Sequence, residues 1–216
     1  MRIAIYDLDK TLTRRATFTP FLAFAARRTA PWRLVLLPLW VVLMLGYKAG
    51  LMDRTTLKRR GMLLMMPDVP RDRLEQIGRE FAARRIAEDG LMPGALRLLA
   101  DDRAIGARIA IATAAFEFYA TAFADAMDID QVIATRWDGQ SIPGGNCYGA
   151  TKKARVMEWL ADQAIDPAAA SLRFVSDSFA DAPLLDLAQD PIFVTDSQGK
   201  SVRAEERGWR AMDLSR

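Results

Sequence analysis

Short apolar runs recur along the chain, and each has the length of a buried strand in a parallel sheet. Segments with apolar residues at helical spacing lie between them. The predicted strands are Ile3–Tyr6, Ala107–Ala112, Gln131–Ala134, Leu172–Ser176 and Pro191–Val194. The predicted helices of this part are Gly94–Asp102, Glu117–Met127, Lys152–Gln163 and Ala180–Ala188. Strands that alternate with helices predict an α/β fold with a doubly wound parallel sheet.

Residues 14–92 break this alternation because their pattern is helical throughout. Helices are expected at about Thr19–Arg28, Trp32–Lys48, Arg54–Met66 and Arg71–Glu88. The whole segment lies between the first predicted strand and the next. We therefore expect residues 1–13 and 93–216 to form the core domain, with residues 14–92 as an all-helical cap inserted over the site.

Polar side chains follow three of the predicted strands. Asp7 and Asp9 come after the first strand, Thr113 ends another, and Asp177 and Asp181 come after a third. The carboxyl ends of parallel strands meet at one edge of a sheet, where ligands of doubly wound folds bind. One such strand end would mean little, but three that converge predict an active site.

The composition limits the chemistry of that site. The 216 residues include no histidine and a single cysteine, Cys147. Ser-His-Asp catalysis, histidine ligands and thiolate zinc clusters are therefore excluded. Any metal must be a hard cation that is held by oxygen ligands.

Positive charge is concentrated in the predicted cap. From Arg14 to Arg60 there are ten Lys and Arg residues and a single acid, Asp53, so this stretch carries +9. Residues 61–216 carry −6, and the whole chain carries +3. A basic segment on an acidic body indicates an anionic partner. We expect an anionic membrane surface rather than a nucleic acid.

The N-terminus does not resemble a signal peptide, so a cytoplasmic location is expected, peripheral to the inner face of the cytoplasmic membrane.

The run Leu34–Tyr47 contains no charged residue. As a helix it would be roughly 21 Å long, shorter than the ~30 Å hydrocarbon core of a bilayer. It is therefore not expected to span a membrane. Two interpretations stay open, a buried helix of the cap and an interfacial segment. The flanking residues Arg27, Arg28, Arg33 and Lys48 suit anionic headgroups and favour the second.

The pair Asp7 and Asp9 offers two carboxylates to one pocket. One carboxylate can attack phosphorus while the other gives and takes protons. An isolated Asp-x-Asp is common in turns. The run Asp-Leu-Asp-Lys-Thr-Leu-Thr after an N-terminal strand is a much stronger signal.

In these motifs the sequence resembles the haloacid dehalogenase superfamily of phosphohydrolases. The first motif of that superfamily is matched by Asp7, Asp9 and Thr11, and the second by the strand that ends in Thr113. Its third motif, a lysine at a helix start, is matched by Lys152, with Lys153 as a rival. The fourth motif, an acidic pair after a strand, is matched by Asp177 and Asp181. The four motifs occur in order and extend over the chain.

The resemblance implies a role for each matched residue. Asp7 would be the nucleophile, Asp9 the general acid and base, and Thr113 and Lys152 would hold the phosphoryl oxygens. Mg²⁺ would be bound by Asp7, the main-chain carbonyl of Asp9, Asp177 and the phosphate. Asp181 would orient a metal-bound water or Lys152. The neighbouring substrate-binding positions would be Ala114 and Ser178.

A helical cap between the first and second motifs resembles the phosphoserine phosphatase-like subfamily. The segment Leu57–Leu64 resembles part of its cap and implies Arg60 as a substrate-binding residue. Members that bind serine carry a glutamate nine residues after the nucleophile, where this chain has Ala16. A serine ammonium would therefore lose its counter-ion.

The apolar and basic cap is instead similar to that of phosphatidylglycerophosphatase C and its relatives. This similarity implies a phosphate on a lipid headgroup as substrate. A small soluble phosphomonoester is the alternative. A phosphotransferase also stays open, whereas a membrane-binding protein with vestigial motifs is disfavoured by the intact set of acidic residues, Thr113 and Lys152.

Overall fold

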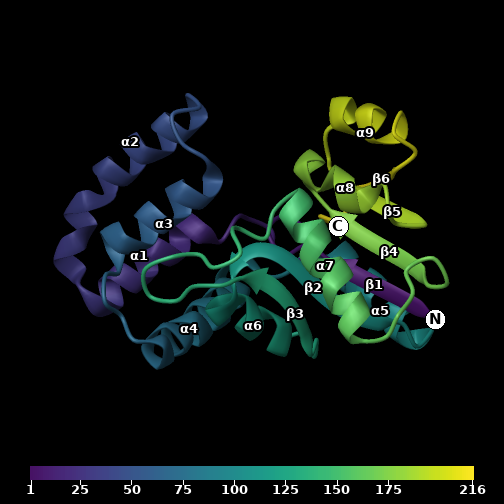
Figure 1. Cartoon of the computed structure of the whole chain (residues 1–216), viewed down its shortest axis with the longest axis horizontal. Coiled ribbons are helices and arrows are strands. Elements are labelled where there is room, and N and C mark those ends of the chain that lie inside the picture. Colours follow the sequence, from purple (N-terminus) through teal and green to yellow (C-terminus); the bar gives the residue numbers. More distant parts are fainter.

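A single parallel sheet forms the centre of the molecule. The computed structural model describes residues 1–216, and Figure 1 shows their arrangement. The strands stand in the order β3-β2-β1-β4-β5-β6. Their bounds are β1 Arg2–Tyr6, β2 Arg108–Phe116, β3 Gln131–Thr135, β4 Ser171–Ser176, β5 Asp190–Val194 and β6 Arg210–Met212. The order reverses beside β1, so the carboxyl ends of β1, β2 and β4 flank the topological switch point. The predicted α/β doubly wound sheet is thereby confirmed.

Helices cover both faces of the sheet. The bounds in the core domain are α5 Pro93–Ala104, α6 Glu117–Asp125, α7 Ala150–Asp162, the 3₁₀ turn η2 Phe179–Asp181, α8 Ala182–Leu185 and α9 Gln198–Glu205. Side chains of α7, α8 and α9 join the apolar cluster on one face, and those of α5 and α6 join the cluster on the other. Successive β1 residues alternate between these faces, with Ile3 and Ile5 on the first face and Ala4 and Tyr6 on the second.

The segment between β1 and β2 is helical, as the sequence pattern predicts. It contains α1 Phe18–Thr29, the 3₁₀ helix η1 Pro31–Leu36, α2 Leu37–Lys48, α3 Arg54–Met65 and α4 Arg71–Asp89. The single helix expected at Trp32–Lys48 is wrong in one respect, because it divides into η1 and α2. Pro38 stands in the first turn of α2. Proline has no N–H to donate to the preceding turn, so it begins a new helix there.

The apolar interior of the helical segment is continuous with that of the core domain. Phe21 of α1 stacks on Tyr119 of α6 with 4.7 Å between ring centroids. Phe81 of α4 meets the edges of both Tyr119 and Phe123. One cluster of buried side chains therefore joins α1, α3 and α4 to α5 and α6. The inner helices of the insertion therefore pack directly on the helices that cover the sheet.

The structure differs from the sequence prediction in three further respects, which concern the bounds of two elements and the presence of two others. Strand β2 continues past Thr113 to Phe116, with an irregular register between Ala112 and Phe116. The helix expected at Ala180–Ala188 is reduced to η2 and α8. Neither α9 nor β6 is predicted by the apolar pattern, because one is strongly polar and the other has three residues.

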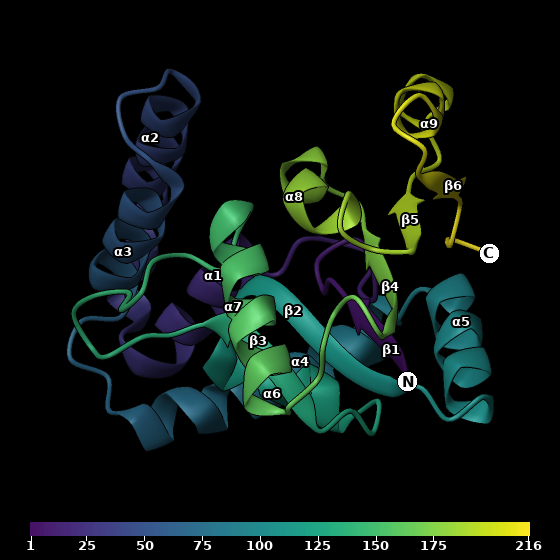
Figure 2. The same cartoon turned by 45° about the vertical axis from the view of Figure 1, so that its right-hand side comes forward.

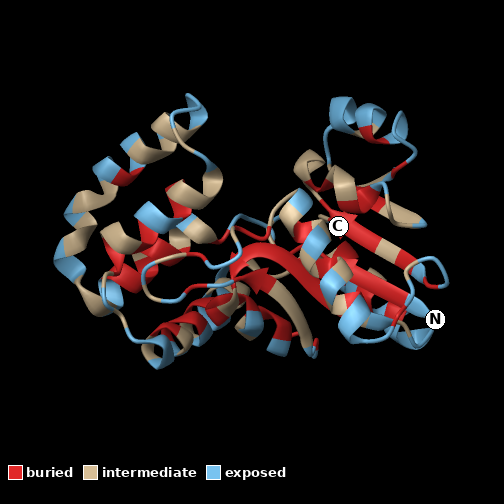
Figure 3. Cartoon of the chain, in the orientation of Figure 1, coloured by how far each residue is buried: buried red, intermediate tan, exposed pale blue.

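Helix α2 is the outermost helix of the cap (Figures 1 and 2). Only Trp40 is buried in the stretch Pro31–Lys48, and Figure 3 colours most of this stretch as intermediate or exposed. By length and composition alone, this stretch is long and apolar enough to cross a membrane. Trp40 packs on Phe18 and lies above Gly61 of α3, which holds α2 against the cap. Of the two interpretations left open for this run, the buried helix of the cap is therefore wrong.

The contact between α4 and α6 yields a test of the shared interior. A Cβ at Gly78 of α4 would lie 2.1 Å from the Phe118 carbonyl oxygen. We expect Gly78→Ala to lower the free energy of unfolding by about 2 kcal/mol or more, because the two backbones must separate. The control is Gly199→Ala in α9, where a Cβ meets nothing within 4 Å. Urea unfolding of both variants checks this, and an unchanged midpoint for Gly78→Ala would contradict the close packing.

Candidate active site

The loop after β1 carries the two aspartates of the first motif to the sheet edge. The carbonyl oxygen of Leu8 accepts hydrogen bonds from the main-chain N–H groups of Thr11, Leu12 and Thr13. Lys10, at the tip, has a φ of 58°, in the left-handed region that few side chains adopt. The main-chain N–H of Asp7 donates to Val175 of β4. Such a tight loop directs Asp7 into the site and leaves Asp9 at its rim.

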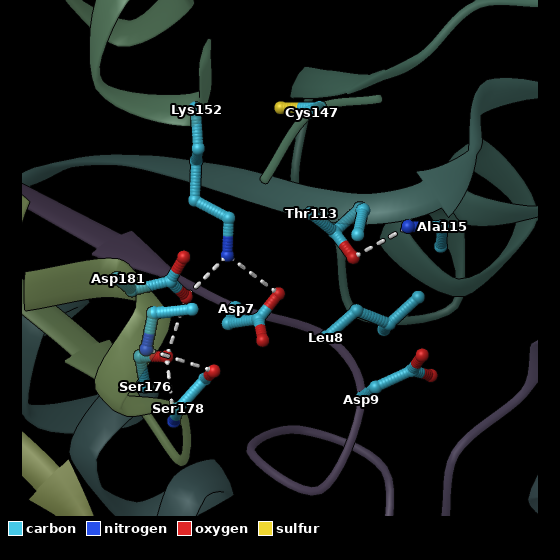
Figure 4. Close-up of polar contacts among 12 residues, drawn as sticks. Asp7, Leu8, Asp9, Thr113, Ala115, Cys147, Lys152, Ser176, Ser178 and Asp181 are labelled. Carbon is cyan, nitrogen blue, oxygen red and sulfur yellow. Dashed lines mark hydrogen bonds and ion pairs between the residues drawn. The ribbon is translucent and has the colours of Figure 1, made fainter. Parts of the chain in front are cut away.

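A buried lysine connects two aspartates at the centre of the site (Figure 4). Lys152 Nζ lies 3.2 Å from Asp7 Oδ1 and 2.6 Å from Asp181 Oδ2. The Ser176 hydroxyl donates to the same oxygen of Asp181 at 2.7 Å. All four side chains are buried. Lys152 occupies the first turn of α7 and reaches down to the ends of β1 and β4, as expected from the lysine motif, whereas Lys153 makes no such contact.

The charges of this cluster shift one another's protonation. Burial is the largest influence on Asp7 and raises its pKa; Lys152 opposes this rise and the carboxylates of Asp181, Asp177 and Asp9 add to it, so that the pKa reaches about 7. Burial alone would lower the pKa of Lys152, but Asp7 and Asp181 raise it above its ordinary value. Lys152 therefore stays an ammonium. Its single positive charge does not neutralise all the carboxylates that surround Asp7.

Asp9 is oriented by the start of the cap. The main-chain N–H and the hydroxyl of Thr17 donate to Asp9 Oδ1 at 2.9 and 2.7 Å. No group of the protein donates to the other oxygen, Oδ2. Figure 4 shows the Asp9 carboxylate apart from the Lys152 cluster. One oxygen of Asp9 is therefore fixed and the other is available to a ligand.

Thr113 lies within β2 at the irregular register, where its side chain faces the site. Its hydroxyl oxygen accepts a hydrogen bond from the main-chain N–H of Ala115 at 3.0 Å (Figure 4). The O–H hydrogen of Thr113 is left free to donate. Both Thr113 and Ala114 line the same cavity as Asp7.

A cavity of about 340 Å³ collects nearly all the predicted residues. Its lining includes Asp7, Asp9, Thr113, Ala114, Lys152, Asp177, Ser178 and Asp181. Ala16 also lies at the cavity wall. It occupies the position at which the serine-binding enzymes that the sequence resembles carry a glutamate. The structure thus brings together residues from four separate segments of the chain.

Arg60 is the one predicted site residue that the structure leaves outside. It is exposed, and its guanidinium contacts the sulfur of Met52 rather than the cavity. Arg54, in the first turn of the same helix, lines the cavity and lies 4.1 Å above the ring of Tyr148. The two arginines are six positions apart in α3, so they project from different faces.

Several cavity residues were not predicted from the sequence. Lys10, Arg54 and Lys200 add positive charge to the lining, and Tyr148 and Phe179 add aromatic walls. The basic character of the cap was the only sequence signal for Arg54. Lys200 comes from α9, whose position beside the site the pattern did not reveal.

The oxygen ligands suit a hard cation. Asp7 Oδ1 is buried and has the ion pair with Lys152 but no hydrogen bond. The half-buried Asp177 carboxylate has neither a hydrogen bond nor an ion pair. Burial, opposed by the charge of Lys10 and assisted by that of Asp9, raises its pKa to about 6. No three acidic, histidine or cysteine side chains are gathered into a ready-made cage. Mg²⁺ is commonly held by one or two carboxylates together with water and substrate phosphate. Asp7 and Asp177 fit that pattern.

Comparisons with known proteins agree with this geometry. A family model described as haloacid dehalogenase-like hydrolase matches residues 4–186. No curated protein matches the sequence.

Three solved structures illustrate the structural likeness. A protein with unknown function from Bordetella pertussis Tohama I has a TM-score of 0.84 and 28% identity, and the match covers 99% of this chain and 98% of that one. A phosphoserine phosphohydrolase-like protein from Francisella tularensis subsp. tularensis SCHU S4 gives 0.65 and 18%, covering 100% and 97%. A structure described as a phospho-aspartyl intermediate analogue of phosphoserine phosphatase gives 0.63 and 14%, covering 100% and 93%. The last two, at such low identity, share the fold with this chain.

The central ion pairs predict a pH-dependent loss of stability. Lys152→Met would leave Asp7 and Asp181 buried without a cation and raise the pKa of Asp7 further. Between the ordinary value of 3.8 and the raised one, the folded protein holds a proton that the unfolded chain has lost, so stability falls as pH rises. We expect a loss of about 3 kcal/mol at pH 8 and a smaller loss at pH 5.

Urea unfolding at both pH values measures this difference. The control is Lys153→Met, the adjacent lysine without an acidic partner, which should change stability little at either pH. A loss for Lys152→Met that is equal at pH 5 and pH 8 would contradict the proposed charge coupling.

Proposed function

Because the chain belongs to the haloacid dehalogenase-like hydrolase family, we propose that it is a Mg²⁺-dependent phosphomonoester hydrolase that acts through a phosphorylated Asp7. The observation that carries the proposal is the buried Asp7 carboxylate, held 3.2 Å from the Lys152 ammonium at the floor of the cavity. A carboxylate beside a permanent cation is ready to meet an anionic substrate.

In the first step, a carboxylate oxygen of Asp7 attacks phosphorus and the bond from phosphorus to the ester oxygen breaks. The departing oxygen takes a proton from Asp9, which lines the cavity and whose Oδ2 accepts no hydrogen bond from the protein. Thr17 fixes the other oxygen of Asp9 and so holds the proton donor in place.

In the second step, water attacks the phosphorus of the aspartyl-phosphate, the bond from phosphorus to the Asp7 oxygen breaks, and inorganic phosphate leaves the restored carboxylate. Asp9 now takes the proton from that water, so the two steps return it to its first state. Lys152 and the free hydroxyl hydrogen of Thr113 contact the phosphoryl oxygens, where negative charge shifts during both steps. Asp181 and Ser176 keep the Lys152 ammonium in position.

Asp7, Asp177 and the main-chain carbonyl of Asp9 would hold the magnesium ion. When bound, Mg²⁺ neutralises charge so that the anionic phosphate can approach the anionic nucleophile. The unpartnered carboxylate of Asp177 supports this assignment.

The substrate class that we favour is a phosphate on a lipid headgroup, such as phosphatidylglycerophosphate. Ala16 at the cavity wall offers no counter-ion for the ammonium of phosphoserine. Arg54 from the cap, rather than Arg60, is the candidate for binding an internal phosphodiester of such a substrate. The alternative is a small soluble phosphomonoester, for which a cavity of about 340 Å³ is ample.

The outer face of η1 and α2 supports a lipid partner. It forms an exposed apolar stripe of Trp32, Val35, Leu39, Val42 and Leu45, spaced three or four residues apart. Val35 is 74% and Val42 59% exposed. Such a stripe costs free energy in water and marks an interaction surface.

The charge around the stripe selects an anionic bilayer as its partner. The stretch from Arg14 to Arg60 carries +9, and each cation near an anionic leaflet contributes about 1 kcal/mol. Trp40 holds α2 along the cap, which suits a helix lying in the interface rather than crossing it. We therefore propose a cytoplasmic protein that is peripheral to the inner face of the cytoplasmic membrane.

The nucleophile is tested with a phosphatase panel that contains Mg²⁺ and offers lipid phosphates in mixed micelles beside phosphoserine and sugar phosphates. Asp7→Asn should abolish turnover of every substrate, because a carboxamide does not form the covalent intermediate. Excess EDTA should stop the wild type and Mg²⁺ should restore it. The control is Asp196→Asn, an exposed aspartate outside the cavity. Activity that survives in Asp7→Asn, or in EDTA, would overturn the corresponding assignment.

The membrane contact is tested with vesicles that contain anionic lipid. We expect the wild type to bind them at low salt and more weakly at high salt, because salt screens charges over roughly 8–10 Å. Val35→Asp combined with Val42→Asp should release the protein from vesicles while turnover of a soluble ester persists. The control is Val202→Asp on α9, which is exposed on the core domain. A wild type that ignores anionic vesicles at low salt and turns over a soluble phosphate would favour the small-molecule alternative. A dimer that the double variant disrupts would assign the stripe to a second copy.

A further inference from the structure

Lys58 is a buried cation at the junction of cap and core that the proposed chemistry does not use. Only 3% of it is exposed, although it belongs to a basic run on α3. Its ammonium donates hydrogen bonds to the Ala114 carbonyl oxygen and, at 3.1 Å, to Asn146 Oδ1. The rings of Phe18 and Phe116 lie 5.0 and 4.9 Å from Nζ. No carboxylate forms an ion pair with it.

A cation in such a place is costly for the fold. Burial and the nearby charge of Arg54 lower the pKa of Lys58 to about 7, against the opposing charges of Asp9, Cys147 and Asp7. The two aromatic rings and two oxygens offset only part of the lost hydration. An apolar side chain would fill this position at less cost, so the ammonium itself calls for a functional explanation.

The hydrogen bond from Lys58 to Ala114 is connected to Thr113, the proposed phosphate-binding residue, through one peptide group. The carbonyl of Ala114 and the N–H of Ala115 belong to the same planar unit. Lys58 and, at 2.8 Å, the Thr135 hydroxyl donate to the carbonyl oxygen of Ala114, and Thr113 Oγ1 accepts from the N–H of Ala115 at 3.0 Å. A cation on the carbonyl also polarises the N–H and strengthens the bond that it donates. A single peptide group thus connects the Thr113 hydroxyl to a side chain of the cap.

We propose that Lys58 is a positioning residue: the cap supplies the ammonium that fixes the Ala114–Ala115 peptide and thereby aims the Thr113 hydroxyl at the phosphoryl group. The cap then supports the phosphate-binding residue through a hydrogen bond to the adjacent peptide, in addition to covering the site. This inference rests on the proposed phosphatase function, since Thr113 is given its role there.

A purely structural role for Lys58 would be to tie α3 to the core. Arg59, the next residue, also crosses from α3 to the core, because its Nε donates to the Gln140 carbonyl oxygen at 2.8 Å. Its bond reaches an exposed loop and not the peptide beside Thr113. Arg59→Met is therefore a matched control that removes a bond between cap and core and leaves the peptide untouched.

The test is a double-mutant cycle on p-nitrophenyl phosphate with Mg²⁺, using wild type, Lys58→Met, Thr113→Val and the double variant. We expect Lys58→Met to lower kcat about tenfold or more in the wild type, with a smaller change in KM. In the Thr113→Val background the same change should lower kcat less than about twofold, because Lys58 acts through that hydroxyl. Arg59→Met should leave kcat near the wild-type value.

The outcomes separate this inference from the function on which it rests. Equal effects of Lys58→Met in both backgrounds, or an unchanged kcat, would overturn the positioning role while the phosphatase stands. A wild type without phosphatase activity would overturn the proposed function, and the same four proteins would then be compared for Mg²⁺-dependent binding of inorganic phosphate by calorimetry. Non-additive losses there would support the role of Lys58, and additive ones would refute it. Lys58→Gln replaces Lys58→Met in the cycle if thermal unfolding shows that the methionine variant does not fold.

Discussion

The active site depends on one buried ammonium, that of Lys152, placed between Asp7 and Asp181. Four carboxylates meet at the ends of β1 and β4, and without this cation the nearest two would repel each other inside the protein. The cation holds Asp7 in place but does not neutralise the whole cluster, so burial and the remaining carboxylates still raise the pKa of Asp7 to about 7. That residual negative charge is the reason the site suits a divalent cation and an electrophilic phosphorus. The Ser176 hydroxyl and the helix position of Lys152 serve to keep the ammonium where both aspartates need it.

The cap is joined to this site in two different ways. Its inner helices share an apolar interior with the core, through Phe21, Phe81 and Tyr119. Polar contacts then reach the site itself: Thr17 fixes Asp9, and Lys58 holds the peptide that follows Thr113. The outer helix α2 makes no comparable contact with the core and presents apolar side chains outward. A single insertion thus contacts the residues of the site on its inner side and exposes apolar side chains on its outer side.

The sequence predicted the sheet and the central site well, and the cap side chains poorly. Asp7, Asp9, Thr113, Asp177 and Asp181 were found because polar residues at the ends of apolar strands converge in a parallel sheet whatever the details of packing. Arg60 was predicted as the substrate-binding residue of α3, whereas Arg54 lines the cavity. Which of the two arginines faces the cavity depends on the rotation of α3 about its axis, and the weakly amphipathic sequence of this helix does not determine that rotation. The burial of Lys58 was equally hidden, since a lysine in a basic run ordinarily faces solvent and only the rings of Phe18 and Phe116 bring it inside. The exposure of α2 was undecided for a similar reason: a helix that is apolar all round carries no pattern that tells its inner face from its outer one.

Rapid acid quench of the enzyme during turnover, followed by mass spectrometry of its peptides, tests the central claim most directly. The account predicts a phosphoryl group on the peptide that contains Asp7, formed in the presence of Mg²⁺ and lost on treatment with hydroxylamine, as an acyl phosphate is. Active enzyme that turns over a phosphomonoester and never carries phosphate at Asp7, or that carries it on another residue, would contradict the account.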